Sequence, residues 1–152
     1  MHRITFVAST RIPASAEDVF DWHEAPGAFE RLTPSWERVR VLRHEGGIRD
    51  GARVSLLVGQ APFSLQWDLE HRDYRHGHSF TDLQLRGPFR FWRHVHRMIP
   101  QGPQDCLLED TIEYELPLGA IGRLVGGPFV RRKLKRLFAY RHDVTRRAFE
   151  PR

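Results

Sequence analysis

The sequence has 152 residues, of which 40% are hydrophobic and 11% aromatic, so one compact domain with a substantial core is expected over residues 1–152. No apolar run approaches the ~20 residues that a transmembrane helix needs. The N-terminus lacks the basic start, apolar stretch and small-residue cleavage site of a signal peptide. The single cysteine, Cys106, excludes an intrachain disulfide and a thiolate metal cluster. We therefore expect a cytoplasmic protein.

The formal net charge of +5 is concentrated near the C-terminus. Residues 128–152 carry nine lysines and arginines against two acidic residues, whereas residues 1–127 are slightly acidic. Such a concentration of positive charge attracts phosphates or anionic lipid, although a solvated helix face is the commoner cause. Because exposed aromatics do not alternate with these basic residues, stacking on single-stranded bases is not indicated and no nucleic-acid partner is expected.

The N-terminal part of the chain predicts a strand followed by two short helices. Alternating apolar residues indicate a strand over residues 3–12. Ser15 is a suitable N-cap for the first helix, and Glu17 and Asp18 favour the positive end of its dipole. The second helix must end before Pro34, because the residue before a proline disfavours helical geometry.

Six further strands and a long helix are predicted downstream. Alternating apolar and polar residues, joined by short turns, indicate consecutive antiparallel hairpins. These strands are expected over residues 37–44, 53–59, 63–74, 79–87, 89–100 and 106–117. The final segment, residues 128–149, has one apolar stripe at helical spacing, and Pro128 suits the first turn of that helix.

This order of elements predicts an α+β fold. One arrangement buries all the apolar faces: a seven-stranded curved antiparallel sheet wraps around the C-terminal helix, with the two short helices between strands 1 and 2. Sheet and helix then touch at the ends and stay apart in the middle. We therefore expect a cavity between them.

The alternation of side chains places an unusual set of residues on the inner face of this sheet. Charged residues on the opposite face of each strand must meet water, which leaves large aromatics and several polar side chains inside. The inner set comprises Trp67, His71, Phe80, Asp82, Gln84, Trp92, His94, His96, Asp110 and Tyr114. Arg141 lies on or near the apolar stripe of the final helix, and we expect it to reach inward toward Asp82 or Asp110.

Four interpretations of the inner polar residues remain open. An unpartnered buried polar group costs roughly 1–3 kcal/mol, so these side chains must bond one another, water or a ligand. They form a hydrogen-bonded network that fixes the sheet register, or they anchor a ligand in the cavity. Alternatively, a pair such as His94–Asp82 or His96–Asp110 performs acid–base catalysis. Metal binding ranks last, because His-x-His alone is a weak signal.

The chain resembles the SRPBCC superfamily, which includes the START, birch-pollen-allergen-like and polyketide cyclase/dehydrase-like proteins. The resemblance covers nearly the whole chain: F…IPASAEDVFDWHEAPGAFERLTP is similar to the family's first strand and two short helices, and GPFRFWRHVH, LEDTIEYELP and FAYRH resemble a bacterial subgroup of small SRPBCC proteins. It implies the helix-grip fold with a cavity between sheet and helix. Members bind or transport lipids, sterols, polyketides and plant hormones, and some are cyclases or dehydratases. Similar domains also occur fused to NAD-dependent epimerase-like proteins, which suggests such a partner.

Three functional hypotheses follow. The first is a binding module for a small, mainly hydrophobic ligand such as a lipid, polyketide or aromatic metabolite, held by the inner residues and Arg141. The second is a cyclase- or dehydratase-type enzyme that uses Asp82, Asp110, His94 or His96 for proton transfer. The third is a protein that binds anionic surfaces through its basic C-terminal helix. The sequence does not decide whether the protein is an enzyme, and we expect no cofactor and no metal.

Overall fold

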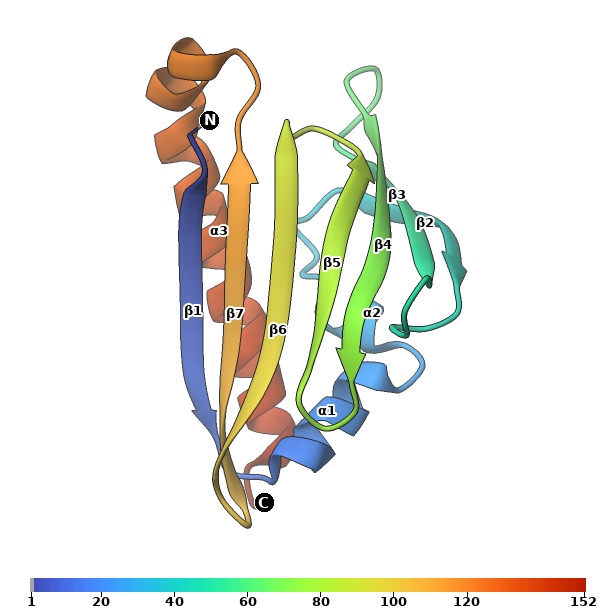
Figure 1. Ribbon diagram of the computed structural model, residues 1–152, viewed down its shortest axis with the longest axis vertical. Coiled ribbons are helices and arrows are strands. Elements are labelled where there is room, and N and C mark those ends of the chain that lie inside the picture. Colours follow the sequence, from blue (N-terminus) through green and yellow to red (C-terminus); the bar gives the residue numbers. More distant parts are fainter. Residues whose placement is uncertain (1) are drawn as a thin grey trace.

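Seven strands form one antiparallel sheet that curves beside a long C-terminal helix, as Figure 1 shows. The computed structural model describes residues 2–152. The strands are β1 (Ile4–Ile12), β2 (Val39–Glu45), β3 (Arg53–Val58), β4 (Leu65–Arg75), β5 (Ser79–Arg86), β6 (Phe91–Gly102) and β7 (Asp105–Glu115). The helices are α1 (Ala16–Glu24), α2 (Ala28–Arg31) and α3 (Gly119–Phe149). The predicted helix-grip architecture and its order of elements are confirmed.

Consecutive strands from β2 to β7 pair as hairpins, and β1 completes the sheet by pairing with β7, in the order β1-β7-β6-β5-β4-β3-β2. The register sets Asp82 of β5 opposite His94 of β6, and His96 of β6 opposite Asp110 of β7. Opposed residues in an antiparallel pair project from the same face of the sheet. The register therefore gathers these two acid–histidine pairs on one face.

Two apolar clusters hold the layers together. The larger lies between the sheet and α3 and includes Phe6, Tyr114 and Phe138. The smaller lies under α1, where the ring of Phe20 packs edge-on against Phe80 with centroids 5.9 Å apart. Helix α1 begins as predicted, because the backbone N–H of Asp18 donates to Oγ of the N-cap Ser15 over 3.1 Å.

The long helix starts nine residues earlier than predicted. Pro128 lies inside α3, not in its first turn, and α3 already begins at Gly119. Four glycines over residues 119–127 lower helix propensity, which is why the sequence indicated a break there. Close packing explains one of them: a Cβ on Gly122 would lie 1.8 Å from the carbonyl oxygen of Pro117. The first turns of α3 extend beyond the end of β7 in Figure 1.

No helix in the described part of the chain, residues 2–152, combines the length and the apolar composition needed to cross a lipid bilayer.

Candidate functional site

Four histidines and two aspartates form one connected polar cluster on the inner face of the sheet, which we call the histidine–aspartate network. Strands β4, β5, β6 and β7 each supply part of it, and α3 supplies one histidine. Five of the six residues are buried, and the sixth, Asp82, is mostly enclosed. Its members are His71, Asp82, His94, His96, Asp110 and His142.

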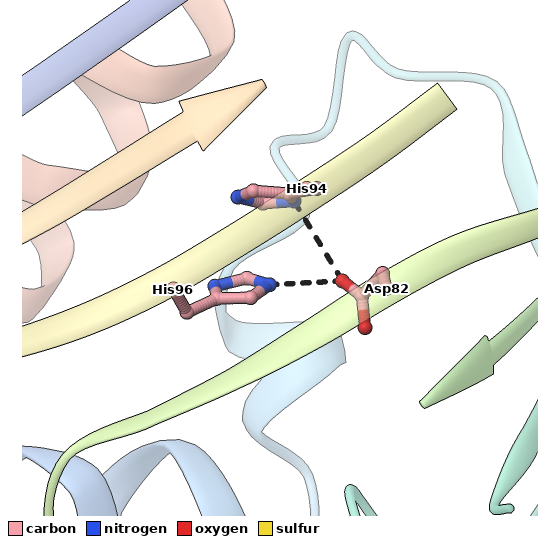
Figure 2. A group of neighbouring side chains, drawn as sticks. All are labelled: Asp82, His94 and His96. Carbon is pink, nitrogen blue, oxygen red and sulfur yellow. Dashed lines mark hydrogen bonds and ion pairs between the residues drawn. The ribbon is translucent and has the colours of Figure 1, made fainter. Parts of the chain in front are cut away.

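Asp82 is surrounded by three of these histidines, two of which Figure 2 shows. His96 Nε2 lies 2.8 Å from Asp82 Oδ2, and His94 Nδ1 lies 3.6 Å from the same oxygen. His71 Nδ1 is 2.6 Å from Asp82 Oδ1. That third contact is short but poorly aligned, so neither of its two atoms makes a hydrogen bond of good geometry.

Asp110 is the second centre of the network and is contacted by three histidines. His94 Nε2 donates to Asp110 Oδ1 over 2.7 Å, and His96 Nδ1 lies 3.0 Å from that oxygen. His142 Nε2 donates to the other oxygen, Oδ2, over 2.6 Å. The second ring nitrogen of His142 lies 2.8 Å from Oγ1 of Thr10 on β1. The network therefore runs from β1 and α3 through the sheet to β4.

Burial and close charges shift the pKa values within the network in opposite directions. Burial lowers the pKa of His96, but Asp82 and Asp110 outweigh it and raise that pKa to about 9. Burial, with the nearby positive charge of His96, lowers the pKa of His94 to about 4. Burial works to raise the pKa of both carboxyls, yet the histidines around them hold both pKa values well below the usual range. At neutral pH, a cationic His96 lies between two carboxylates.

Aromatic packing fixes the orientation of the central imidazoles. Phe80 stacks on His96 with ring centroids 4.0 Å apart and planes 13° apart. The rings of His94 and His96 are themselves 3.7 Å apart, and Phe138 of α3 meets His94 edge-on at 5.2 Å. The rings are thereby held so that both nitrogens of each imidazole face a carboxylate.

Of the predicted inner residues, the structure joins the three histidines and two aspartates in one network and places the other predicted site residues around them. Phe80 covers His96, as described above. Trp67, Trp92 and Tyr114 gather with Phe89 at another part of the inner face, where Trp67 and Trp92 pack edge-on at 5.0 Å. These aromatics form part of the apolar core.

Gln84 and Arg141 have partners in the backbone. The Gln84 side-chain amide donates to the carbonyl of Phe89 over 2.7 Å and so fixes the turn between β5 and β6. Arg141 reaches inward, as predicted, but donates to the carbonyl of Leu32 over 3.1 Å and makes no hydrogen bond to Asp82 or Asp110. Burial lowers the pKa of Arg141. The carboxylates of Asp110 and Asp82 act in the opposite direction but do not outweigh burial.

Sequence analysis missed His142 and Thr10. His142 lies four residues after Phe138, so it falls on the same face of α3 as a fully buried core residue. That spacing was the available signal for an inward-facing histidine. Thr10 is in phase with the buried Phe6 and Ile12 along β1, so strand alternation was the available signal that its side chain faces inward.

A cleft of about 470 Å³ opens between β1 and α3. Its apolar surface includes Phe6, Ala8 and Phe138, and its inner polar surface includes Thr10 and His142. Basic side chains at its rim come from α3, namely Arg131, Lys135 and Arg146. The residues that the sequence predicted as cavity walls do not border this cleft. Their link to it is the hydrogen bond between Asp110 and His142, which does line the cleft.

The site contains groups suited to proton transfer and to metal ligation. Each network histidine contacts a carboxylate, the arrangement that orients an imidazole for acid–base work. Asp82, His94 and His96 also offer one ligand atom each within 4.8 Å of one another. Thiol chemistry is disfavoured, because burial raises the pKa of Cys106 to about 11.

A seven-stranded sheet around a C-terminal helix, with polar groups buried on its inner face, defines the START/birch-pollen-allergen-like class of proteins. Residues 12–138 match the family model described as polyketide cyclase / dehydrase and lipid transport, and the chain belongs to this family. The sequence has no significant match among curated proteins.

Solved structures share the fold at low sequence identity. Norcoclaurine synthase from Thalictrum flavum, in complex with dopamine and hydroxybenzaldehyde, is 14% identical with a TM-score of 0.72, covering 97% of this chain and 86% of that one. A START superfamily protein from Mycobacterium smegmatis is 16% identical with a TM-score of 0.68, covering 95% and 96%. The Zhui aromatase/cyclase from Streptomyces sp. R1128 is 18% identical with a TM-score of 0.67, covering 95% and 92%.

Proposed function

We propose that the protein binds a small, mainly hydrophobic ligand with an anionic or polar end, in the cleft between β1 and α3. The observation that carries this proposal is the cleft itself, whose apolar floor leads inward to His142 and Thr10. Ligand sites commonly combine an apolar surface with a few convergent polar groups. Family membership supports a role of this general kind, because the family description includes lipid transport and cyclase or dehydrase activity.

The charge at the rim favours an anionic end on the ligand. Arg131 and Lys135 have exposed side chains on α3 and, within residues 2–152, no acidic partner at ion-pair distance, whereas Arg146 is paired with Asp143 and Glu150. Arg131 and Lys135 are therefore available to a carboxylate, sulfonate or phosphate at the cleft entrance. A ligand of this kind would place its apolar part over Phe6 and Phe138.

A blocking variant tests the proposal. Ala139 lines the cleft and is exposed, so Ala139→Phe fills the cleft without disturbing a buried contact. The matched control is Ala148→Phe, an exposed alanine of the same helix that does not line the cleft. The probes are the fluorescent aromatic sulfonate 1-anilinonaphthalene-8-sulfonate and native mass spectrometry of purified protein, followed by organic extraction of co-purified molecules.

We expect Ala139→Phe to weaken probe binding at least tenfold and to remove any co-purified small molecule, while Ala148→Phe leaves both unchanged. Equal binding of the probe by wild type and both variants would contradict binding in this cleft. Circular dichroism of the two variants checks that each retains the fold.

Acid–base catalysis in the same cleft is a second candidate function, favoured by one specific contact. His142 lines the cleft wall, and its Nε2 donates to the buried Asp110, a pairing that stabilises an imidazolium formed by proton abstraction. This function resembles the cyclase- or dehydratase-type chemistry in the family description. His142→Gln would then abolish turnover of a cleft ligand while its affinity changes little. Equal loss of affinity and turnover would favour a binding role alone.

Binding to anionic membrane surfaces is a third candidate, favoured by the exposed start of α3. Leu118, Ile121, Leu124, Val125 and Phe129 are each between 67% and 81% exposed. The exposed Arg131 and Arg132 follow directly along the same helix. Apolar side chains beside basic ones suit insertion into the interface of an anionic bilayer.

A further inference from the structure

We propose that Asp82, His94 and His96 bind one divalent transition-metal ion, in a site separate from the β1–α3 cleft. From the sequence we expected no metal, because His-x-His alone is a weak signal. The sheet adds a third ligand from β5 and a carboxylate behind both imidazoles. Figure 2 shows the two rings of β6 turned toward the carboxylate of Asp82.

The separations of the donor atoms fit a metal ion. Zinc binds imidazole nitrogen and carboxylate oxygen at roughly 2.0–2.2 Å, which in tetrahedral directions holds the donors about 3.3 Å apart. Asp82 Oδ2 is 2.8 Å from His96 Nε2 and 3.6 Å from His94 Nδ1, values that lie on either side of that spacing. All three donors lie within 4.8 Å of one another. Adjustment of these side chains would therefore place an ion between the three donors.

Asp110 orients both imidazoles for this role. The ring nitrogens that do not face Asp82, His94 Nε2 and His96 Nδ1, lie 2.7 and 3.0 Å from one oxygen of Asp110. Metal-binding histidines almost always donate their second N–H to a carboxylate, carbonyl or water, which fixes the tautomer and directs the free nitrogen at the metal. Here, one buried carboxylate performs this task for two histidines at once.

His71 provides an independent observation at the same place. His71 is buried, with 7% of its surface exposed, and its Nδ1 is 2.6 Å from Asp82 Oδ1. Neither atom has a well-aligned hydrogen bond, although both are fully enclosed. Rotation of the Asp82 carboxylate toward a bound ion would let its second oxygen accept from His71 in better geometry. The misaligned contact thus points to a ligand at the opposite oxygen.

The ligand set selects the class of metal. Two imidazole nitrogens and one carboxylate oxygen suit Zn²⁺, Fe²⁺ or Co²⁺, whereas Mg²⁺ and Ca²⁺ prefer oxygen ligands throughout. A divalent ion also balances the two buried carboxylates, Asp82 and Asp110, without a protonated His96. Three protein ligands leave at least one coordination position for water or a substrate. The side chain of Asp82, at 15%, is the most exposed of the three ligands.

The chain supplies its own control for adventitious binding. Glu17, Asp21 and His76 form a second group of three potential ligands, but all three are exposed. His76 already has Asp21 at 2.9 Å on the surface. His76→Gln therefore removes a surface histidine in an acidic cluster and leaves the proposed site intact.

The experiment is a titration of the full chain, stripped with EDTA, by Zn²⁺ with calorimetric detection and by Co²⁺ with visible absorption. Wild type and His76→Gln should each bind one ion with the same affinity. His96→Gln should lose this binding, and Asp110→Asn should weaken it roughly 10–100-fold, as expected for the residue that orients the two ligands. Circular dichroism establishes that each variant is folded.

A measurement on wild type avoids dependence on buried substitutions. In ¹⁵N spectra of the imidazoles, added Zn²⁺ should shift Nδ1 of His94 and Nε2 of His96 and leave both nitrogens of His76 unchanged. Two results would overturn the proposal: no stoichiometric ion on wild type at millimolar Zn²⁺, or binding that is lost in His76→Gln and kept in His96→Gln. Ala139→Phe should leave metal binding unchanged, so failure of the cleft proposal and failure of this one are distinguishable.

Discussion

His142 of α3 and Asp110 of β7 are joined by a hydrogen bond of 2.6 Å, which fastens the C-terminal helix to the sheet beside the apolar cluster that includes Phe138. Thr10 of β1 contacts the second nitrogen of the same ring at 2.8 Å. One imidazole therefore connects β1, near the N-terminus, with β7 and α3.

Replacing that imidazole should lower stability measurably. We expect His142→Ala to reduce the free energy of unfolding by about 1–3 kcal/mol, because Asp110 and Thr10 each lose a buried partner. Urea denaturation followed by circular dichroism measures the change. His44→Ala, an exposed histidine on β2, is the control and should change stability by no more than about 0.5 kcal/mol. Equal effects of the two substitutions would contradict the structural role of His142.

Asp110→Asn should cost more, because it leaves a buried cation without one of its two counter-charges. Removing one partner of a buried ion pair typically costs about 3–5 kcal/mol. The neighbouring Glu109 faces away from the network and pairs with Arg97 across 3.4 Å at the surface. Glu109→Gln should therefore change the free energy of unfolding by about 1 kcal/mol or less. A loss below about 1 kcal/mol in Asp110→Asn would show that the carboxylate is not balancing His96.

Stability of the metal-free protein should be greatest near pH 6.5 and fall on both sides. His96 has its pKa raised to about 9, so its contribution is complete below about pH 6.5 and is lost as the pH rises through 9. His94 and His23 have pKa values lowered to about 4, chiefly by burial. Protonating these two in the unfolded chain removes stability as the pH falls from about 6.5 to 4.

Denaturant midpoints between pH 4 and pH 9.5, measured in the presence of EDTA, test this dependence. The alkaline loss should be on the order of 3 kcal/mol and should disappear in folded His96→Gln. A wild-type profile that stays level from pH 6.5 to 9 would contradict a cationic His96 between the two carboxylates.

Membrane association is expected to depend on the first turns of α3. We expect Arg131→Glu combined with Arg132→Glu to abolish sedimentation with phosphatidylglycerol vesicles, because reversal repels the anionic surface. The equivalent double reversal at the exposed Arg38 and Arg40 near β2 should have little effect. Leu124→Glu should reduce binding by itself, since it removes an 81% exposed apolar side chain from the contact. Wild-type protein that stays in the supernatant at low salt would exclude this function.

The order of elements and the inner face of the sheet were predictable because both follow from local rules. Alternation along a strand placed His94 and His96 inside and Arg93 and Arg97 outside, and hairpin connectivity placed β5, β6 and β7 side by side. The same alternation along β7 predicted that Asp110 lies on the inner face with the other polar residues.

Cross-strand detail was less accessible from the sequence. Either histidine of β6 could have faced either aspartate, and the structure has both histidines contact both carboxylates. The start of α3 was missed because its four glycines lower local helix propensity, although the helix forms there and its close turn on Pro117 leaves no space for a Cβ at Gly122. The β1–α3 cleft depends on the distance between an edge strand and a helix, which no sequence periodicity encodes.

The pairing of β6 with its neighbours also has a consequence for how the chain avoids misfolding. A slip of β6 by one residue would turn Arg93 and Arg97 into the core and carry His94 and His96 to the outer face. The slipped sheet would also bury Asp82 and Asp110 without their imidazoles. The buried charges thus disfavour pairing of β6 in a shifted register. An insertion within β6 should therefore be far more disruptive than one in the exposed edge strand β2.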